Sequence, residues 1–222
     1  MPNWIKTLLK PPYKKSMLWL MQTNFYWEII MRIIPFVRFS TYYTSFRGWK
    51  YQRGYLKLKK GDIVLSKDRK KLTTLLIPGE MTHAALCVDN RDMEWEISEM
   101  THTDYTKSHF FDMCKEADKI IILRCRDWDK EYIDNVLIPT CISYQDAKYD
   151  VTFDLGVKCL YCSELVYQSD IERRLKCSLE DLEGLGRPYI SPTGLLHAEN
   201  VDIIWDSDKE VDPFNRPWLS KF

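Results

Sequence analysis

The chain has 222 residues, of which 45% are hydrophobic and 29% are charged. This length suits one sizeable domain with its own core, and the composition excludes a disordered chain. The formal net charge is zero, but the charges are unevenly distributed. Residues 1–60 hold twelve Lys and Arg and one acidic residue, Glu28, so a basic arm precedes an acidic body.

The cysteine content favours a reducing compartment. Seven cysteines is an odd number, and their spacing suggests no disulfide framework. Four of them lie in or beside apolar stretches, where a free cysteine behaves as a small hydrophobe: Cys87, Cys114, Cys125 and Cys141. No cleavable signal peptide is visible, and the apolar stretch 17–39 is too interrupted for a transmembrane span. We therefore expect a cytoplasmic protein, with peripheral membrane contact as an additional expectation.

Residues 1–50 form the first predicted unit, a basic, aromatic and helical extension. A helix is predicted over 16–34, with Ser16 as N-cap and Pro35 as its stop. The aromatic rings of this segment favour docking on the rest of the domain. An interfacial membrane anchor is the alternative, because aromatic rings with Lys and Arg suit the headgroup layer. Binding of single-stranded nucleic acid is a weaker alternative, since no nucleic-acid motif accompanies the charge, and we expect none.

From Lys57 onward the pattern predicts strands first and helices later. The predicted strands are 63–66, 82–88, 94–99, 119–124 and 201–205, with a hairpin turn at 89–92. The predicted helices are 129–145 and 160–171. Because strands and helices are segregated along the chain, the predicted class is α+β.

Two segments carry the chemistry. Cys162 opens an apolar helix, and a helix N-terminus favours the thiolate over the thiol. His83 lies in an apolar strand and is a candidate for the imidazole that takes the thiol proton. The histidine precedes the cysteine, which is the reverse of the papain order, but catalytic groups are defined by geometry and role.

Several pieces in a fixed order resemble permuted papain-like enzymes of the YiiX type, relatives of the NlpC-type cell-wall peptidases and of lecithin:retinol acyltransferase. These pieces are Gly61–Leu65, Met81–Leu86, Trp95–Met100, Tyr149–Asp150 with Tyr161–Val166, and Ser191–Leu196. The resemblance spans roughly residues 55–206 and implies a circularly permuted papain-like (NlpC-type) fold. In this fold an antiparallel sheet packs against helices. The predicted catalytic domain is therefore 51–222.

The resemblance also implies roles for particular residues. It implies Cys162 as nucleophile, His83 as general base, and a glutamate on the following strand that orients the imidazole. Glu99 and Glu96 compete for that third place, and Glu99 is preferred because Ile97-Ser98-Glu99 fits the family pattern better. Tyr149 is a candidate to assist the oxyanion, beside the backbone N–H of Cys162. No metal or organic cofactor is expected.

The expected function is therefore a cysteine hydrolase or acyltransferase. Its candidate substrates are peptidoglycan-type peptides, isopeptides or other amides, and acyl lipids. One alternative is a non-catalytic module that binds a ligand or partner on the same fold. A second alternative uses Cys159 and Cys162 as a Cys-x-x-Cys redox pair or half a zinc site. Glu164 is expected on the helix surface, and the other three histidines are expected to be exposed: His102, His109 and His197.

Overall fold

The computed structural model describes residues 48–69, 71, 79–91, 93–150, 153, 155–156, 158–181 and 188–210. Its centre is a six-stranded antiparallel sheet with the order β10-β5-β1-β2-β3-β4. The strands are β1 (Ile63–Lys67), β2 (His83–Arg91), β3 (Glu94–Thr101), β4 (Asp104–His109), β5 (Lys119–Cys125) and β10 (Val201–Asp206). Two small ladders stand outside the sheet, formed by β6 (Lys148–Tyr149) with β7 (Cys159–Leu160) and by β8 (Glu180–Asp181) with β9 (Pro188–Tyr189).

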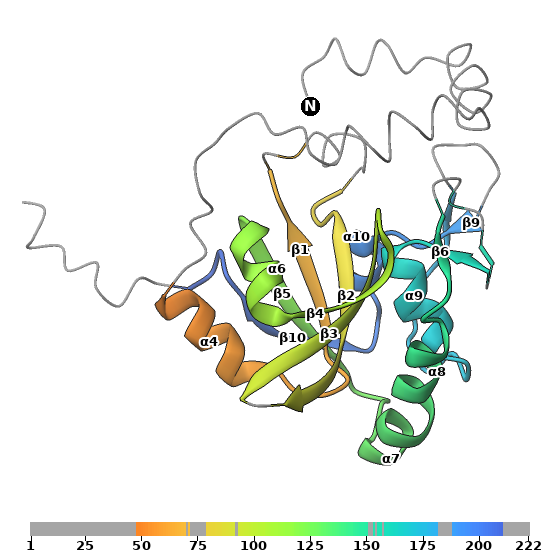
Figure 1. Cartoon of the computed structure of the whole chain (residues 1–222), viewed down its shortest axis with the longest axis horizontal. Coiled ribbons are helices and arrows are strands. Elements are labelled where there is room, and N and C mark those ends of the chain that lie inside the picture. Colours follow the sequence, from red (N-terminus) through yellow and green to blue (C-terminus); the bar gives the residue numbers. More distant parts are fainter. Residues whose placement is uncertain are drawn as a thin grey trace, which may run out of the picture.

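Helices cover both faces of the sheet. On one side lie α4 (Trp49–Lys57) and α6 (Phe110–Glu116), and on the other lie α7 (Lys130–Tyr132), η2 (Ile133–Leu137), α8 (Ile138–Ser143), α9 (Cys162–Ser169) and α10 (Pro192–Leu196). Figure 1 shows this layering, with α9 running alongside the strands of the sheet centre. Together these elements form an α+β architecture, as predicted.

The central strands are apolar on both faces because their side chains pack into two hydrophobic cores, one on each side of the sheet. In β1 successive side chains alternate between the cores, so Ile63 and Leu65 face the α9 side and Val64 faces the α6 side. The same alternation in β2 sends Leu86 to the α9 side and Cys87 to the α6 side. Continuous apolar runs therefore mark strands that are buried on both faces.

Most of the expected elements are confirmed, with shifted ends. The five predicted strands correspond to β1, β2, β3, β5 and β10, and the two predicted helices to the α7–α8 region and α9. The turn between β2 and β3 is tighter than predicted, because β2 continues to Arg91. The sequence pattern did not predict β4 or α6. The polar β4 is an edge strand, so its sequence lacks an apolar run.

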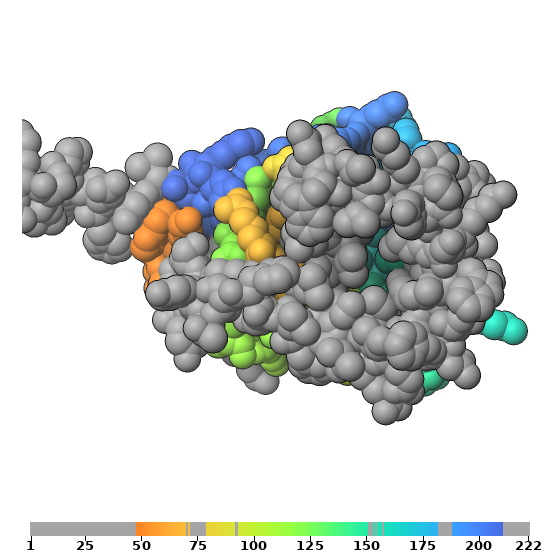
Figure 2. Space-filling view, turned by 90° about the horizontal axis from the view of Figure 1, so that it is seen from above, coloured from red at the N-terminus to blue at the C-terminus, as the bar shows by residue number. Residues whose placement is uncertain are grey.

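The predicted extension lies mostly outside the described residues, as do its helix 16–34 and the stretch 17–39. Within the described part of the chain, α4 crosses the predicted boundary at residue 50 and packs on the domain. Gly54 lies against Phe110 and Trp205, which lets α4 approach closely. Figure 2 shows α4 in orange beside the blue C-terminal part of the described chain. Among the helices of the described ranges, none is long and apolar enough to cross a membrane.

The Gly61-Asp62 pair builds the turn that leads into the central strand β1. The backbone N–H of Asp62 donates to the carbonyl of Lys59, and Gly61 takes φ 85° at the third turn position, as in a type II turn. The Asp62 carboxylate is buried and accepts two 2.7 Å hydrogen bonds from Arg124. A third bond comes from the Lys59 N–H. This pair therefore has a structural role, fixing where the sheet begins.

We expect Gly61→Ala to lower the free energy of unfolding by about 3 kcal/mol, because a Cβ there adds steric overlap to a left-handed backbone. The added carbon would lie 2.7 Å from Cδ1 of Ile133. Urea unfolding measures the loss. The control is Gly61→Ala in an Ile133→Ala background, where the side-chain carbons that the added Cβ would meet are removed. Relative to Ile133→Ala alone, the change should cost only the backbone term of about 1 kcal/mol. Equal losses in the two backgrounds would contradict the packing argument.

Candidate active site

Cys162 is the first residue of α9 and is buried, with 4% of its surface exposed. The helix begins here because Tyr161 is extended (φ −102°, ψ 173°) and its N–H donates to the Glu164 carboxylate, which forms a capping box. Apolar residues that follow, including Leu165, are fully buried against the sheet. This packing holds the thiol at the positive end of the helix dipole.

His83 stands at the first position of β2, where the sheet opens. The pairing of β2 with β1 extends to His83 and Ser66, but the pairing of β2 with β3 ends at Ala85 and Glu99. The backbone N–H of Ala84 donates to the sulfur of Cys162. The opening between β2 and β3 is therefore where the start of α9 meets the sheet.

Three side chains predicted from the sequence come together at this opening. Nε2 of His83 lies 2.6 Å from Oε2 of Glu99, and the His83 ring also shares a hydrogen bond with the Cys162 thiol. Because Nε2 faces Glu99, Nδ1 is left for the sulfur. Glu96, the other candidate for the third place, lies on the opposite face of β3 and pairs with Lys107 at 3.3 Å.

Burial and hydrogen bonding compete in setting the charges of the three groups. Burial lowers the pKa of His83, but its hydrogen bonds to Cys162 and Glu99 and their charges raise that pKa to about 10. Burial raises the pKa of Cys162, and the bond to His83, its charge and the N–H groups of Ala84 and Ser163 bring it below its ordinary value. The pKa of Glu99 is also lowered, since His83 and Ser108 outweigh burial. The favoured state is a thiolate–imidazolium pair beside a carboxylate.

Tyr149, the candidate for assisting the oxyanion, lies near the start of α9 in the fold. Tyr149 pairs with Leu160, two residues before Cys162, in the parallel ladder of β6 and β7. Its own N–H donates to Asp104 at 3.0 Å. The ring is partly buried against the core on the α9 side. A contribution of Tyr149 to an oxyanion hole stays a prediction.

The arrangement of Cys159 and Cys162 argues against a redox pair. Cys159 is exposed in β7, and the residues between the two cysteines are extended. Three extended steps separate the Cα atoms by about 10 Å, whereas a disulfide needs less than about 7 Å. Among the residues that the structure describes, no group of three or more His, Cys, Asp or Glu is arranged to hold a metal ion.

Glu164 is not on the helix surface, so that expectation is wrong. The side chain is fully buried. It accepts hydrogen bonds from the N–H groups of Gly156 at 2.6 Å and Tyr161 at 3.4 Å. Burial, partly offset by these bonds, raises its pKa to about 7. The pattern of α9 did not reveal this because the carboxylate turns back to cap its own helix.

The expectation that the other three histidines are exposed is confirmed: His102, His109 and His197.

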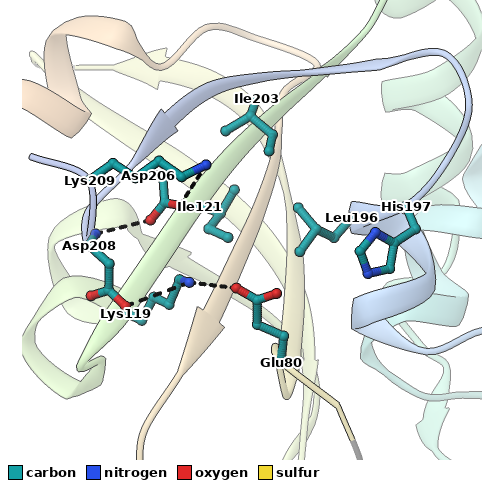
Figure 3. Close-up of a pocket in the computed structure, with 9 residues that line it drawn as sticks. All are labelled: Glu80, Lys119, Ile121, Leu196, His197, Ile203, Asp206, Asp208 and Lys209. Carbon is teal, nitrogen blue, oxygen red and sulfur yellow. Dashed lines mark hydrogen bonds and ion pairs between the residues drawn. The ribbon is translucent and has the colours of Figure 1, made fainter.

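A pocket lies at the same end of the sheet, on the side of β5 and β10 (Figure 3). It is lined by Glu80, Lys119, Ile121, Leu196, His197, Ile203, Asp206, Asp208 and Lys209. Its charges largely pair with one another, as in the 2.6 Å contact between Lys119 and Glu80. Thr193 of α10 also accepts a bond from the N–H of Met81 at 3.1 Å. These contacts fix the segment that leads into His83.

Comparison with known proteins identifies the family. The model of the permuted papain-like amidases of the YaeF/YiiX type, peptidase family C92, matches residues 57–193. The chain belongs to this family. The family resemblance and the permuted papain-like fold expected from the sequence are both confirmed. Family membership makes the protein a relative of cysteine amidases.

A solved structure agrees on the fold. The chain is similar to the metalloprotein YiiX from Escherichia coli O157:H7, with a TM-score of 0.56 and 18% identity. The match covers 66% of this chain and 96% of that one. At this identity the likeness shows the fold alone. No curated protein matches the chain.

One residue of the site was not among those predicted from the sequence. Ser108 on β4 donates a short hydrogen bond to Oε1 of Glu99. The register pairs Glu99 with Thr106 and Ile97 with Ser108, so Ser108 is the diagonal neighbour of Glu99 on the same face. A hairpin turn placed at 102–103 would have revealed this neighbour, but the strand β4 itself was not predicted.

We expect iodoacetamide to alkylate Cys162 much faster than Cys177 at neutral pH, because hydrogen bonds and the charge of His83 lower the pKa of Cys162. Burial raises the pKa of Cys177 to about 11, so Cys177 should stay largely unmodified. Peptide mass spectrometry of the two sites gives the rates. In His83→Ala the rate at Cys162 should fall about tenfold for each unit by which the thiol pKa rises. Equal rates at Cys162 with and without the imidazole would contradict the ion pair.

Proposed function

We propose that this protein is a thiol amidase in which Cys162 is the nucleophile, His83 the acid and base, and Glu99 the group that orients the imidazole. The observation that carries the proposal is the continuous connection from Glu99 through His83 to Cys162. Membership of the amidase family supports it independently. A non-catalytic binding module would not need a charge-stabilised thiol next to an oriented imidazole.

The geometry suits a two-step acyl transfer. The Cys162 thiolate attacks the amide carbonyl, and the proton on His83 passes to the leaving nitrogen as the C–N bond breaks. This leaves an acyl thioester on Cys162. Neutral His83 then takes a proton from water, whose oxygen attacks the thioester and releases the acid and the thiolate. If an alcohol or amine replaces water in the second step, the same residues carry out acyl transfer.

The negative charge on the carbonyl oxygen needs hydrogen-bond donors. The backbone N–H of Cys162 lies in the first turn of α9 and has no partner within the helix. It is the first donor that we propose for the oxyanion, and the hydroxyl of Tyr149 is the second. The positive end of the helix dipole adds to the stabilisation of both the thiolate and the oxyanion.

The substrate that we propose is an amide, as in a peptide or isopeptide, and an acyl lipid is the alternative. The acyl-lipid alternative rests on residues 1–60, which contain twelve basic residues and only one acidic residue. Such a segment suits the surface of an anionic membrane, so we include peripheral membrane contact through residues 1–50 in the proposal.

We expect Cys162→Ala to abolish amide hydrolysis and Glu99→Gln to lower kcat by 10² or more. Loss of the orienting carboxylate costs about 10⁴ in a serine protease, where the imidazole takes the wrong tautomer. Hydrolysis of a panel of fluorogenic peptide and acyl amides measures the effect. Cys159→Ser is the matched control, since Cys159 lies three residues from the nucleophile but is exposed, and its activity should be unchanged.

Activity that survives in Cys162→Ala would overturn the proposed mechanism. If the wild-type thiol is reactive but no amide is hydrolysed, acyl esters become the favoured substrates. The same panel can include such esters. Inert Cys162 in the wild type, together with no turnover, would favour the binding module.

We expect the full chain to co-sediment with vesicles containing anionic lipid, and to be released by salt, because basic residues near the surface each contribute about 1 kcal/mol. The variant Lys14→Gln, Lys15→Gln, Arg32→Gln, Arg38→Gln should lose most of this binding. A variant with four glutamines at Lys130, Lys158, Arg173 and Lys176 is the matched control for net charge. If the two variants bind equally, the anchor is excluded, and docking of the segment on the domain is then favoured.

A further inference from the structure

Glu99 is held from two sides by two neighbouring strands. One carboxylate oxygen, Oε2, lies 2.6 Å from Nε2 of His83 on β2, and the other, Oε1, accepts the hydroxyl of Ser108 on β4. The Glu99 side chain is 12% exposed, so water has little access to it. A carboxylate that is bonded at both oxygens has one preferred orientation, and a single bond would leave it free to rotate about its last torsion.

From this geometry we infer that Ser108 is a positioning residue of the active site, acting through Glu99 on the tautomer and orientation of His83. This inference rests on the proposed function and deepens it. Within the described part of the chain, the Ser108 hydroxyl bonds to Glu99 and not to His83 or Cys162, so it acts through the carboxylate and not on the reacting atoms. Its hydroxyl can reach Glu99 because residues 97 and 108 pair in register and Glu99 is the diagonal neighbour.

The charged groups around Glu99 come from several elements. His83 faces it from β2, and behind His83 stands Cys162 at the start of α9. Lys71, in the chain after β1, adds a positive charge that also favours the carboxylate, and Lys71 is itself paired with Glu116 of α6. Ser108 is the neutral donor in this set. Its removal therefore changes hydrogen bonding to Glu99 without changing the net charge of the site.

The test is the pH profile of Cys162 alkylation by iodoacetamide, which needs no knowledge of the substrate. In Ser108→Ala the acid limb should shift to higher pH, because a carboxylate bonded at one oxygen only can rotate away from the ring and then holds the imidazolium less well. On that limb the rate should fall about tenfold, the size expected from losing one hydrogen bond to a charged group. Ser108→Thr, which keeps a hydroxyl, should restore the wild-type profile, and Ser108→Val, its isostere without the hydroxyl, should not.

Two controls separate positioning from a structural effect. Ser98→Ala removes the 2.8 Å bond between Ser98 and Tyr105, next to Glu99 on β3 but on the opposite face, and should leave the profile in place. In a Glu99→Gln background, Ser108→Ala should add little further loss, since both changes act through one group. If Ser108→Ala does not fold, the Thr and Val variants decide.

If Ser108→Thr and Ser108→Val show the same pH profile of Cys162 alkylation, the inference is overturned while the proposed function stays intact. An undiminished effect of Ser108→Ala in the Glu99→Gln background would overturn it too, because the serine would then act by another route. Wild-type Cys162 that stays unreactive across the pH range, together with no turnover of amides or esters, would overturn the proposed function and this inference together.

Discussion

The contact between the Cys162 sulfur and the His83 ring is the interaction on which the site depends. A thiolate and an imidazolium out of water carry a large desolvation cost, and attraction offsets it only if the remaining donors and acceptors are also satisfied. Here the sulfur accepts from His83 and from the N–H groups of Ala84 and Ser163. The other side of the ring meets Glu99. The start of α9, the first residue of β2 and the neighbouring strand β3 must therefore meet at one point.

The sheet provides this meeting point because the pairing of β2 with β3 stops at Ala85 and Glu99. If the β2–β3 ladder continued past Ala85, the N–H of Ala84 would be used between strands or turned away from the sulfur. Because the pairing stops there, α9 can bring its first residue to the opening, with Glu164 capping the helix behind it. The same end of the sheet is fixed on the other side by Lys119–Glu80 and by Thr193. The rigid surroundings keep the thiol and the imidazole in contact before any substrate arrives.

Local pattern predicted the sheet centre, the helix start at Cys162 and the strand at His83, and it failed where side-chain direction depends on neighbours. Buried strands such as β1 and β5 show as apolar runs, whereas the choice of Glu99 over Glu96 came from the family pattern. The polar edge strand β4 has no such signal, so Ser108 was missed with it. Glu164 was misplaced because a charged residue in the first turn of a helix can face solvent or cap the helix, and only the approach of Gly156 decides.

The order of the proposed site residues along the chain has a physical consequence. His83, Glu99 and Ser108 all lie on consecutive strands β2, β3 and β4, so local hairpins fix their mutual positions, whereas Cys162 arrives from a helix more than sixty residues after Glu99. The positions of His83 and Glu99 are therefore set by short-range strand pairing, and the position of the Cys162 thiol is set by the packing of α9. Changes that loosen this packing should separate the thiol from a still-intact His83–Glu99 pair, which makes thiolate formation the property most sensitive to the fold.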